Sequence, residues 1–156
     1  MFATIPNPIP ARMKGVNRAE VCDVNFSELV KGWAGTPDAK PAPHEPILEG
    51  SALDAQGFRD LFESQLISRH LDLMARVLRV QNKVFYTIGS SGHEGNAMVA
   101  RAARHTDPAF LHYRSGGFMA ERFRKLPGMD PIMDSALSFA ASAEDPASGG
   151  RHKVWG

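Results

Sequence analysis

The stretch LDAQGFRDLFESQLISRHLDLMARVLRVQN, residues 53–82, decides the fold of this chain. It contains no proline, and only Gly57 interrupts a run of helix-forming residues. Its apolar residues recur every three or four positions, which predicts one helix with both apolar stripes on a single broad face. We interpret His70, which lies between the stripes, as a core or interface histidine. The first stripe is Phe58, Phe62, Leu66, Leu73, Val77 and Val80, and the second is Ile67, Leu71, Met74 and Leu78.

A helix of that length would extend about 45 Å at its usual rise per residue. A globular chain of this size has a radius of gyration of about 15 Å. So long an apolar face therefore indicates partners beyond this chain.

The chain has 156 residues, 43% of them hydrophobic, and a formal net charge of +1. These values favour one globular domain and give no general argument for nucleic-acid or membrane partners. No apolar run approaches the length of a membrane span, and the first ten residues do not resemble a secretory signal. We therefore expect a cytoplasmic protein. The single cysteine, Cys22, excludes an intrachain disulfide and a cysteine zinc cluster.

The first 52 residues hold seven of the eleven prolines and predict an extended arm, residues 1–52, before a domain at residues 53–156. Within the arm, the apolar spacing of Asn25–Trp33 predicts a short helical turn. The arm is either disordered or wrapped on a larger body, and Trp33 favours wrapping.

Downstream of residue 82 we expect mainly helices, with short strands at residues 83–87 and 109–113. Ser91 and Glu94 fit a capping box at the start of an alanine-rich helix, residues 93–105. Further helices are expected at residues 118–125 and, after an Asp130 cap, from Pro131 to about residue 143. Residues 145–150 predict a loop.

Tyr113 and Arg114 form the sharpest chemical feature, because they stand where an apolar run meets a glycine-rich turn. A guanidinium there can bind a phosphate through two hydrogen bonds, and a tyrosine hydroxyl can add a third donor. The alternative is an arginine that pairs with a surface carboxylate. Residues 101–125 also carry a local surplus of basic residues, which is typical either of a polyanion site or of a solvated helix face.

Taken in order, these segments resemble the start of the α-type region of thiamine-diphosphate-dependent 2-oxo acid dehydrogenases. The resemblance rests on a long helix, Gly92-His93-Glu94-Gly95, an alanine-rich helix, Tyr113-Arg114 and Asp145-Pro-x-x-Gly-Gly-Arg151. It covers roughly residues 55–156, and it implies that residues 53–156 are the mainly helical N-terminal portion of an α/β thiamine-diphosphate-binding domain with short strands. The relatives are the decarboxylating components of the pyruvate and branched-chain complexes.

The resemblance implies roles for individual residues. His112, Tyr113 and Arg114 would bind the diphosphate of the cofactor, and Tyr113 would also border the substrate. Tyr86 would lie at the 2-oxo acid pocket. His93 would be a helix-start residue or a pocket residue. The active-site loop would hold Arg151, His152 and Lys153.

The family's Gly-Asp-Gly segment and asparagine, which hold magnesium, do not occur in these 156 residues. The resemblance therefore implies magnesium ligands outside this chain, no catalytic residue within it and no activity in isolation. The complete enzyme would decarboxylate a 2-oxo acid and pass the acyl group to a lipoyl acyltransferase. A β-type region or subunit would be the other partner.

Two other interpretations stay open. One is a non-catalytic helical interaction module derived from such an enzyme. The other is a thiamine enzyme of transketolase type, which the Tyr-Arg pair and the glycine-rich loop disfavour.

Overall fold

The computed structural model of the chain describes residues 18–35, 41–85 and 88–151. The chain divides into two compact units, with the division between residues 40 and 41. This division lies before the expected boundary at residue 53. The described parts are mainly helical, which confirms the coarse prediction.

Of the first unit the structure describes residues 18–35, which contain one helix, α1 (Arg18–Lys31). It is longer than the helical turn predicted at Asn25–Trp33 and begins earlier. Phe26, Leu29 and Val30 recur at helical spacing on it, and all three side chains are exposed. The first unit therefore presents an apolar helix face.

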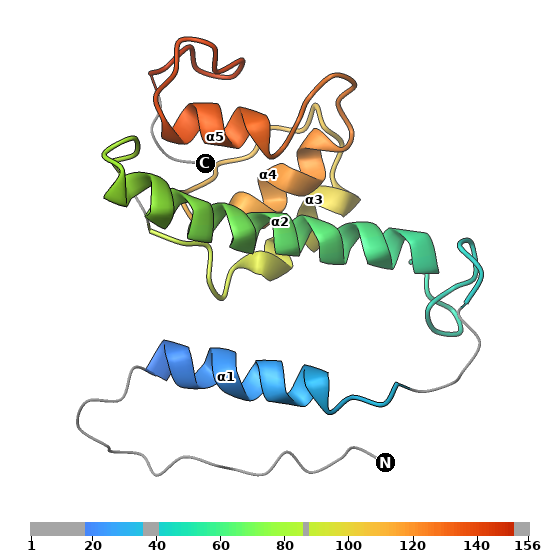
Figure 1. Ribbon diagram of the computed structural model, residues 1–156. Coiled ribbons are helices and arrows are strands. Elements are labelled where there is room, and N and C mark those ends of the chain that lie inside the picture. Colours follow the sequence, from blue (N-terminus) through green and yellow to red (C-terminus); the bar gives the residue numbers. More distant parts are fainter. Residues whose placement is uncertain (1–17, 36–40, 86–87, 152–156) are drawn as a thin grey trace. The chain divides into compact units, whose positions relative to one another are not determined.

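The second unit is organised around α2 (Ala55–Val80), which confirms the long helix expected within residues 53–82. Figure 1 shows α2 running the length of this unit. Its start is fully capped: the Asp54 side chain accepts a hydrogen bond from the Gly57 amide at 2.7 Å. The amides of Ala55 and Gln56 donate to the carbonyls of Glu45 and Pro43, each at 2.9 Å. Residues 41–54 thus satisfy the amides that a helix start leaves without partners.

The end of α2 is equally well defined. Asn82 has a positive φ of 58°, the left-handed conformation that stops many helices. The Asn82 amide donates to the Arg79 carbonyl and the Lys83 amide to the Leu78 carbonyl, each at 2.9 Å. This pair of bonds is the Schellman arrangement, and it turns the chain so that Val84 is buried.

The two apolar stripes of α2 do not share one face, so that prediction was wrong. Leu71 is buried and Met74 and Leu78 are partly buried against the core, whereas every residue of the Phe58–Val80 stripe is exposed. The angular step of a helix explains the result, because residues 58 and 62 are separated from residues 71 and 78 by about half a turn. His70 is also exposed, so its interpretation as a core residue was wrong.

Within the described residues, four shorter helical segments follow α2, and the one at residues 116–123 matches its predicted helix, 118–125, to within two residues at each end. The predicted helix at residues 93–105 is divided and ends sooner, and the last predicted helix is much shorter than expected. Ser91 provides no cap, since Glu94 accepts from the Gly92 amide instead. The segments are η1 (Glu94–Asn96), α3 (Ala97–Ala102), α4 (Gly116–Phe123) and α5 (Met133–Phe139).

The short strands that would make the fold α/β do not occur in the described parts of the chain, so this part of the fold prediction was wrong. Residues 109–113 form no ladder and Phe110 is fully exposed. Residues 83–85 are also irregular, and residues 86–87 lie outside the described residues. A β-branched or aromatic run needs a neighbouring strand to pair with, and the only β-bridge described joins Pro46 to Asp54.

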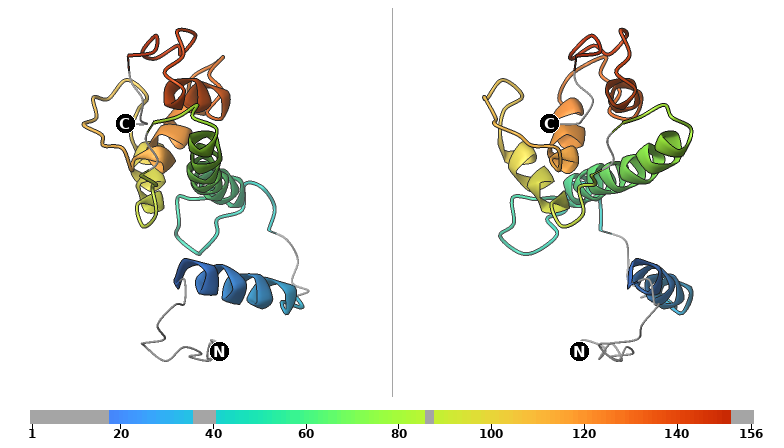
Figure 2. Two further views of the ribbon diagram at one scale, coloured as in Figure 1. Left: turned by 60° about the vertical axis from the view of Figure 1, so that its left-hand side comes forward. Right: turned by 90° about the vertical axis from the view of Figure 1, so that its left-hand side faces the viewer.

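The core of the second unit lies where α2, α4 and α5 meet. α4 and α5 lie on the same side of α2 (Figure 2). The buried cluster consists of Leu71, Ala75, Val84, Ala120, Phe123 and Phe139.

No described helix is long and apolar enough to cross a membrane.

We predict that Gly117→Ala destabilises the protein by about 1–3 kcal/mol. A Cβ at Gly117 would lie 2.9 Å from the Glu94 carbonyl oxygen, and this backbone atom cannot rotate away. Gly95→Ala is the matched control, because nothing lies within 4 Å of a Cβ there. Thermal and urea unfolding of the two variants measure the difference. Equal stability would contradict the close approach of α4 to η1.

We predict that low pH destabilises the start of α2, because it protonates the Asp54 carboxylate that caps this helix. The hydrogen bond from the Gly57 amide holds the pKa of Asp54 below its ordinary value of 3.8. The folded state therefore binds this proton less readily than the unfolded chain. The stabilisation of the folded state by the Asp54 carboxylate is present above pH 3.8 and is lost as the pH falls through the folded pKa. Asp54→Asn keeps an accepting oxygen but does not titrate. We expect the thermal midpoint of the wild-type chain to fall more steeply than that of Asp54→Asn below about pH 4.

Candidate functional site

The predicted phosphate-binding residues lie at the start of α4. Tyr113 and Arg114 immediately precede this helix, and the Arg114 guanidinium carbon lies 5.2 Å from the centre of the Tyr113 ring. The Ser115 side chain makes no capping hydrogen bond at the start of α4. The first backbone amides of this helix therefore have no side-chain acceptor from Ser115, and the cationic Arg114 comes just before them in the sequence. A helix start and a guanidinium both favour an anion.

Two histidines border this pair. The His93 and His112 rings meet edge to face with their centres 5.2 Å apart, and both side chains are exposed. Nδ1 of His112 accepts a hydrogen bond from the Arg114 amide at 3.0 Å. This bond requires an unprotonated Nδ1, so the imidazole proton is on Nε2. The structure thus brings His93 to the predicted site residues.

Arg114 is anchored on one side only. Its Nη1 donates to the Gly89 carbonyl at 2.7 Å. Within the described residues, its other N–H groups make no hydrogen bond or ion pair. Arg114 does not pair with a described surface carboxylate, which was the alternative interpretation. An arginine held by one nitrogen keeps a planar set of donors for a ligand.

The loop that carries Gly89 is attached to α2 through Asp72. The Oδ2 atom of Asp72 accepts from the Ser90 amide at 2.8 Å and from the Ser90 hydroxyl at 2.9 Å. Arg69 pairs with the same oxygen at 2.9 Å, and Ser68 donates to the Ser90 hydroxyl at 2.7 Å. Ser68 and Ser90 are almost fully buried. This polar cluster fixes the loop against the middle of α2.

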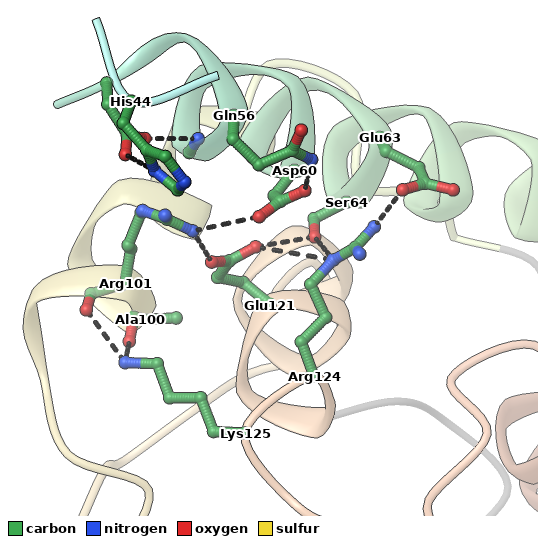
Figure 3. A network of polar contacts seen from close by, with 12 residues as sticks. His44, Gln56, Asp60, Glu63, Ser64, Ala100, Arg101, Glu121, Arg124 and Lys125 are labelled. Atoms are coloured by element: carbon green, nitrogen blue, oxygen red, sulfur yellow. Dashed lines mark hydrogen bonds and ion pairs between the residues drawn. The ribbon is translucent and has the colours of Figure 1, made fainter. Parts of the chain in front are cut away.

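A second polar cluster joins α2, α3 and α4 around Glu121, which is 1% exposed (Figure 3). Its Oε1 accepts from Arg101 of α3 at 2.9 Å, and its Oε2 accepts from Ser64 of α2 at 2.7 Å. Arg124 lies 3.7 Å from Oε2 and also contacts Ser64 and Glu63. A buried carboxylate is stable only when paired and hydrogen-bonded, and Glu121 is both. This cluster holds α4 in place.

Most basic residues of the segment 101–125 make polar contacts with other residues of the chain. Lys125 donates to the carbonyls of Ala100 and Arg101 at 2.7 and 2.8 Å (Figure 3). Arg122 donates to the Asp107 carbonyl, and Arg104 pairs with the Asp107 side chain. Much of the cationic surplus therefore contacts carbonyls and carboxylates of the chain, while Arg104 stays largely exposed to solvent. Of the six basic residues described in this segment, Arg114 is the one whose side chain makes a single hydrogen bond and no described ion pair. The other five are Arg101, Arg104, Arg122, Arg124 and Lys125.

We predict that Glu121→Ala destabilises the protein by about 3 kcal/mol or more, because it leaves two arginines and a buried serine without their shared acceptor. Glu63→Ala is the matched control. Glu63 also bonds Arg124, at 2.6 Å, but its side chain is 63% exposed, so its loss should cost less than about 1 kcal/mol. Urea unfolding measures both variants. A Glu121→Ala chain as stable as Glu63→Ala would show that the cluster does not hold the helices together.

The structure does not test all the predicted site residues. Tyr86, His152 and Lys153 lie outside the described residues. Arg151 donates through Nε to the Ser148 carbonyl of its own loop at 3.0 Å, and no described contact joins it to Arg114. The predicted loop at residues 145–150 is present and is organised by Asp145, which is buried and accepts from the Ser148 hydroxyl.

Sequence reasoning missed Asp72, Ser90 and Glu121. The sequence does contain a signal for Asp72. Ser64, Ser68 and Asp72 follow one another at intervals of four, so they form a polar stripe along the helix beside the apolar one. Polar residues on a buried helix edge indicate partners from another segment. Nothing in the local sequence shows that Glu121 would be buried.

The described residues contain no group of three or more histidine, cysteine, aspartate or glutamate side chains that could hold a metal ion. Comparison with known proteins adds no further assignment: neither a family model, nor a curated protein, nor a solved structure matches the chain. The arrangement around Arg114 is thus the feature on which a functional proposal has to rest. Chemically, it can bind and orient an anion.

Proposed function

We propose that this chain is the N-terminal part of the α-type region of a thiamine-diphosphate-dependent 2-oxo acid dehydrogenase. The observation that carries the proposal is the Arg114 guanidinium, which is fixed through one nitrogen and keeps its other donors beside the start of α4. The diphosphate of the cofactor is the ligand that the sequence resemblance expects there.

The residues present fit one part of such a cofactor. The guanidinium can bind two phosphate oxygens in its plane, and the uncapped start of α4 favours negative charge. The Tyr113 ring lies beside the Arg114 guanidinium. The Nε2 atom of His112 can donate one further hydrogen bond to the anion, because its Nδ1 atom is occupied as an acceptor. The sequence resemblance places the magnesium ligands outside this chain, because the family's Gly-Asp-Gly segment and asparagine do not occur in these 156 residues. The chain therefore supplies an anion anchor and leaves the metal to other segments.

When bound, thiamine diphosphate supplies the chemistry that stabilises a carbanion during decarboxylation. This chain's own residues would bind and orient it. Arg114 would fix the diphosphate end, and His112 would hold the backbone of Arg114 through its Nδ1 atom. His93 and Tyr113 would limit the access of water on the exposed side. No proton transfer is assigned to the chain, and the isolated chain is expected to be inactive.

We predict that Arg114→Gln weakens binding of inorganic pyrophosphate and of thiamine diphosphate with magnesium by roughly tenfold or more, since each charged hydrogen bond contributes about 1.5–3 kcal/mol. Isothermal titration of the full chain measures the affinity. Arg104→Gln is the matched control, because it removes the same charge from an exposed arginine that pairs with Asp107.

Three outcomes would contradict the proposal. The first is that the wild-type chain binds neither ligand. The second is that Arg104→Gln weakens binding as much as Arg114→Gln, which would indicate general electrostatic attraction. The third is that pyrophosphate binds and thiamine diphosphate binds no better, which would leave an anion site without a cofactor.

The exposed apolar stripe of α2 favours a second candidate, the non-catalytic interaction module. Phe62, Leu73 and Val77 are each at least half exposed along one side of this helix. Such a stripe is typical of a helix that packs against another protein segment. If the chain is only an interaction module, its thermal stability will not change with thiamine diphosphate and magnesium.

A further inference from the structure

We infer that Asp72 is a positioning residue for Arg114 and acts through the peptide group that joins Gly89 to Ser90. This inference rests on the proposed anion-binding function of Arg114. The three groups come from separate parts of the chain: Asp72 from α2, the peptide group from the loop after it, and Arg114 from the start of α4.

One peptide group is bound on both sides. Its carbonyl, from Gly89, accepts from Nη1 of Arg114 at 2.7 Å, and its N–H, from Ser90, donates to Oδ2 of Asp72 at 2.8 Å. The peptide bond is planar and its C=O and N–H point in opposite directions. Asp72 and Arg114 therefore bind opposite ends of one rigid dipole.

The charges match that dipole. The carboxylate lies at the positive N–H end and the guanidinium at the negative carbonyl end. A hydrogen bond to a charged group on one side polarises the peptide and strengthens the bond on the other side. The Asp72 carboxylate thereby makes the Gly89 carbonyl a better acceptor for Arg114.

The position of Asp72 is itself well determined. Its side chain is 11% exposed, Arg69 pairs with it at 2.9 Å, and Arg69 also lies 3.4 Å from Glu94. A Cβ at Gly89 would lie 2.9 Å from Oδ2 and 3.0 Å from Cγ of Asp72, so a side chain at residue 89 would displace the Asp72 carboxylate. The loop cannot shift along α2 without breaking these contacts. The Nη1 atom of Arg114 is thus bound to a loop that is itself fixed on α2, and this contact sets the direction of its remaining donors.

The first test observes Arg114 without any ligand. The side-chain Nε–Hε signal of Arg114 is identified in a ¹H–¹⁵N spectrum of the full chain by its disappearance in Arg114→Lys. We expect Asp72→Asn to move this signal toward the position of a free arginine and to speed its hydrogen exchange. Asp60→Asn is the matched control, because Asp60 lies on the same helix and contacts Arg101 instead.

The second test measures binding. Asp72→Asn, which keeps the size of the side chain, should weaken pyrophosphate binding by roughly tenfold, as outer residues that orient a ligand-binding group commonly do. In the Arg114→Gln background, the same substitution should have no further effect, because Asp72 acts only through Arg114. Circular dichroism confirms that each variant is folded.

The two proposals fail in different ways. If the wild-type chain does not bind pyrophosphate but the Arg114 signal responds to Asp72→Asn, the anion-binding function is wrong and the positioning contact is supported. If the wild-type chain binds and Asp72→Asn leaves both the signal and the affinity unchanged, the positioning role is wrong. Equal effects of Asp72→Asn in the wild-type and Arg114→Gln backgrounds would also overturn it.

Discussion

The buried carboxylate of Glu121 is the contact on which the second unit depends. It lies between three helices, and its two oxygens are shared by Arg101, Ser64 and Arg124. An isolated charge at this depth would be strongly unfavourable, so the carboxylate forces its partners to stay close. The position of α4, and with it the position of Arg114, follows from that requirement. Apolar packing around Phe123 and Leu71 then closes the same junction from the other side.

The long helix was predictable because its signals are local. The absence of proline, the apolar period and the acidic cap at Asp54 all lie within the stretch that forms α2. Its end was predictable to within two residues. The direction of its faces was not, because residues at intermediate angles can be assigned to either side of a helix. The burial of Ser64 and Ser68, rather than of Phe62, decides which side is internal.

The strands and the site show where sequence reasoning stopped. An apolar run at residues 109–113 favours a strand, yet a strand needs a neighbour, and the described chain offers none. Tyr113 and Arg114 were identified from their chemistry, and the structure adds that the ring of the preceding His112 lies 5.2 Å from the ring of His93. The support of Arg114 by α2 depends on contacts between residues far apart in the sequence, Asp72 with Ser90 and Gly89 with Arg114. No local pattern predicts such pairings.

The capping of α2 by residues 41–54 has a practical consequence for anyone who shortens this chain. Proline content alone suggests a recombinant fragment that starts near residue 53. That fragment would discard the carbonyls of Pro43 and Glu45, and the amides of Gln56 and Ala55 would lose their acceptors. A fragment that starts at Pro41 keeps the whole cap and coincides with the edge of the second compact unit. The proline-rich segment is therefore in part a folded component of the unit that carries Arg114.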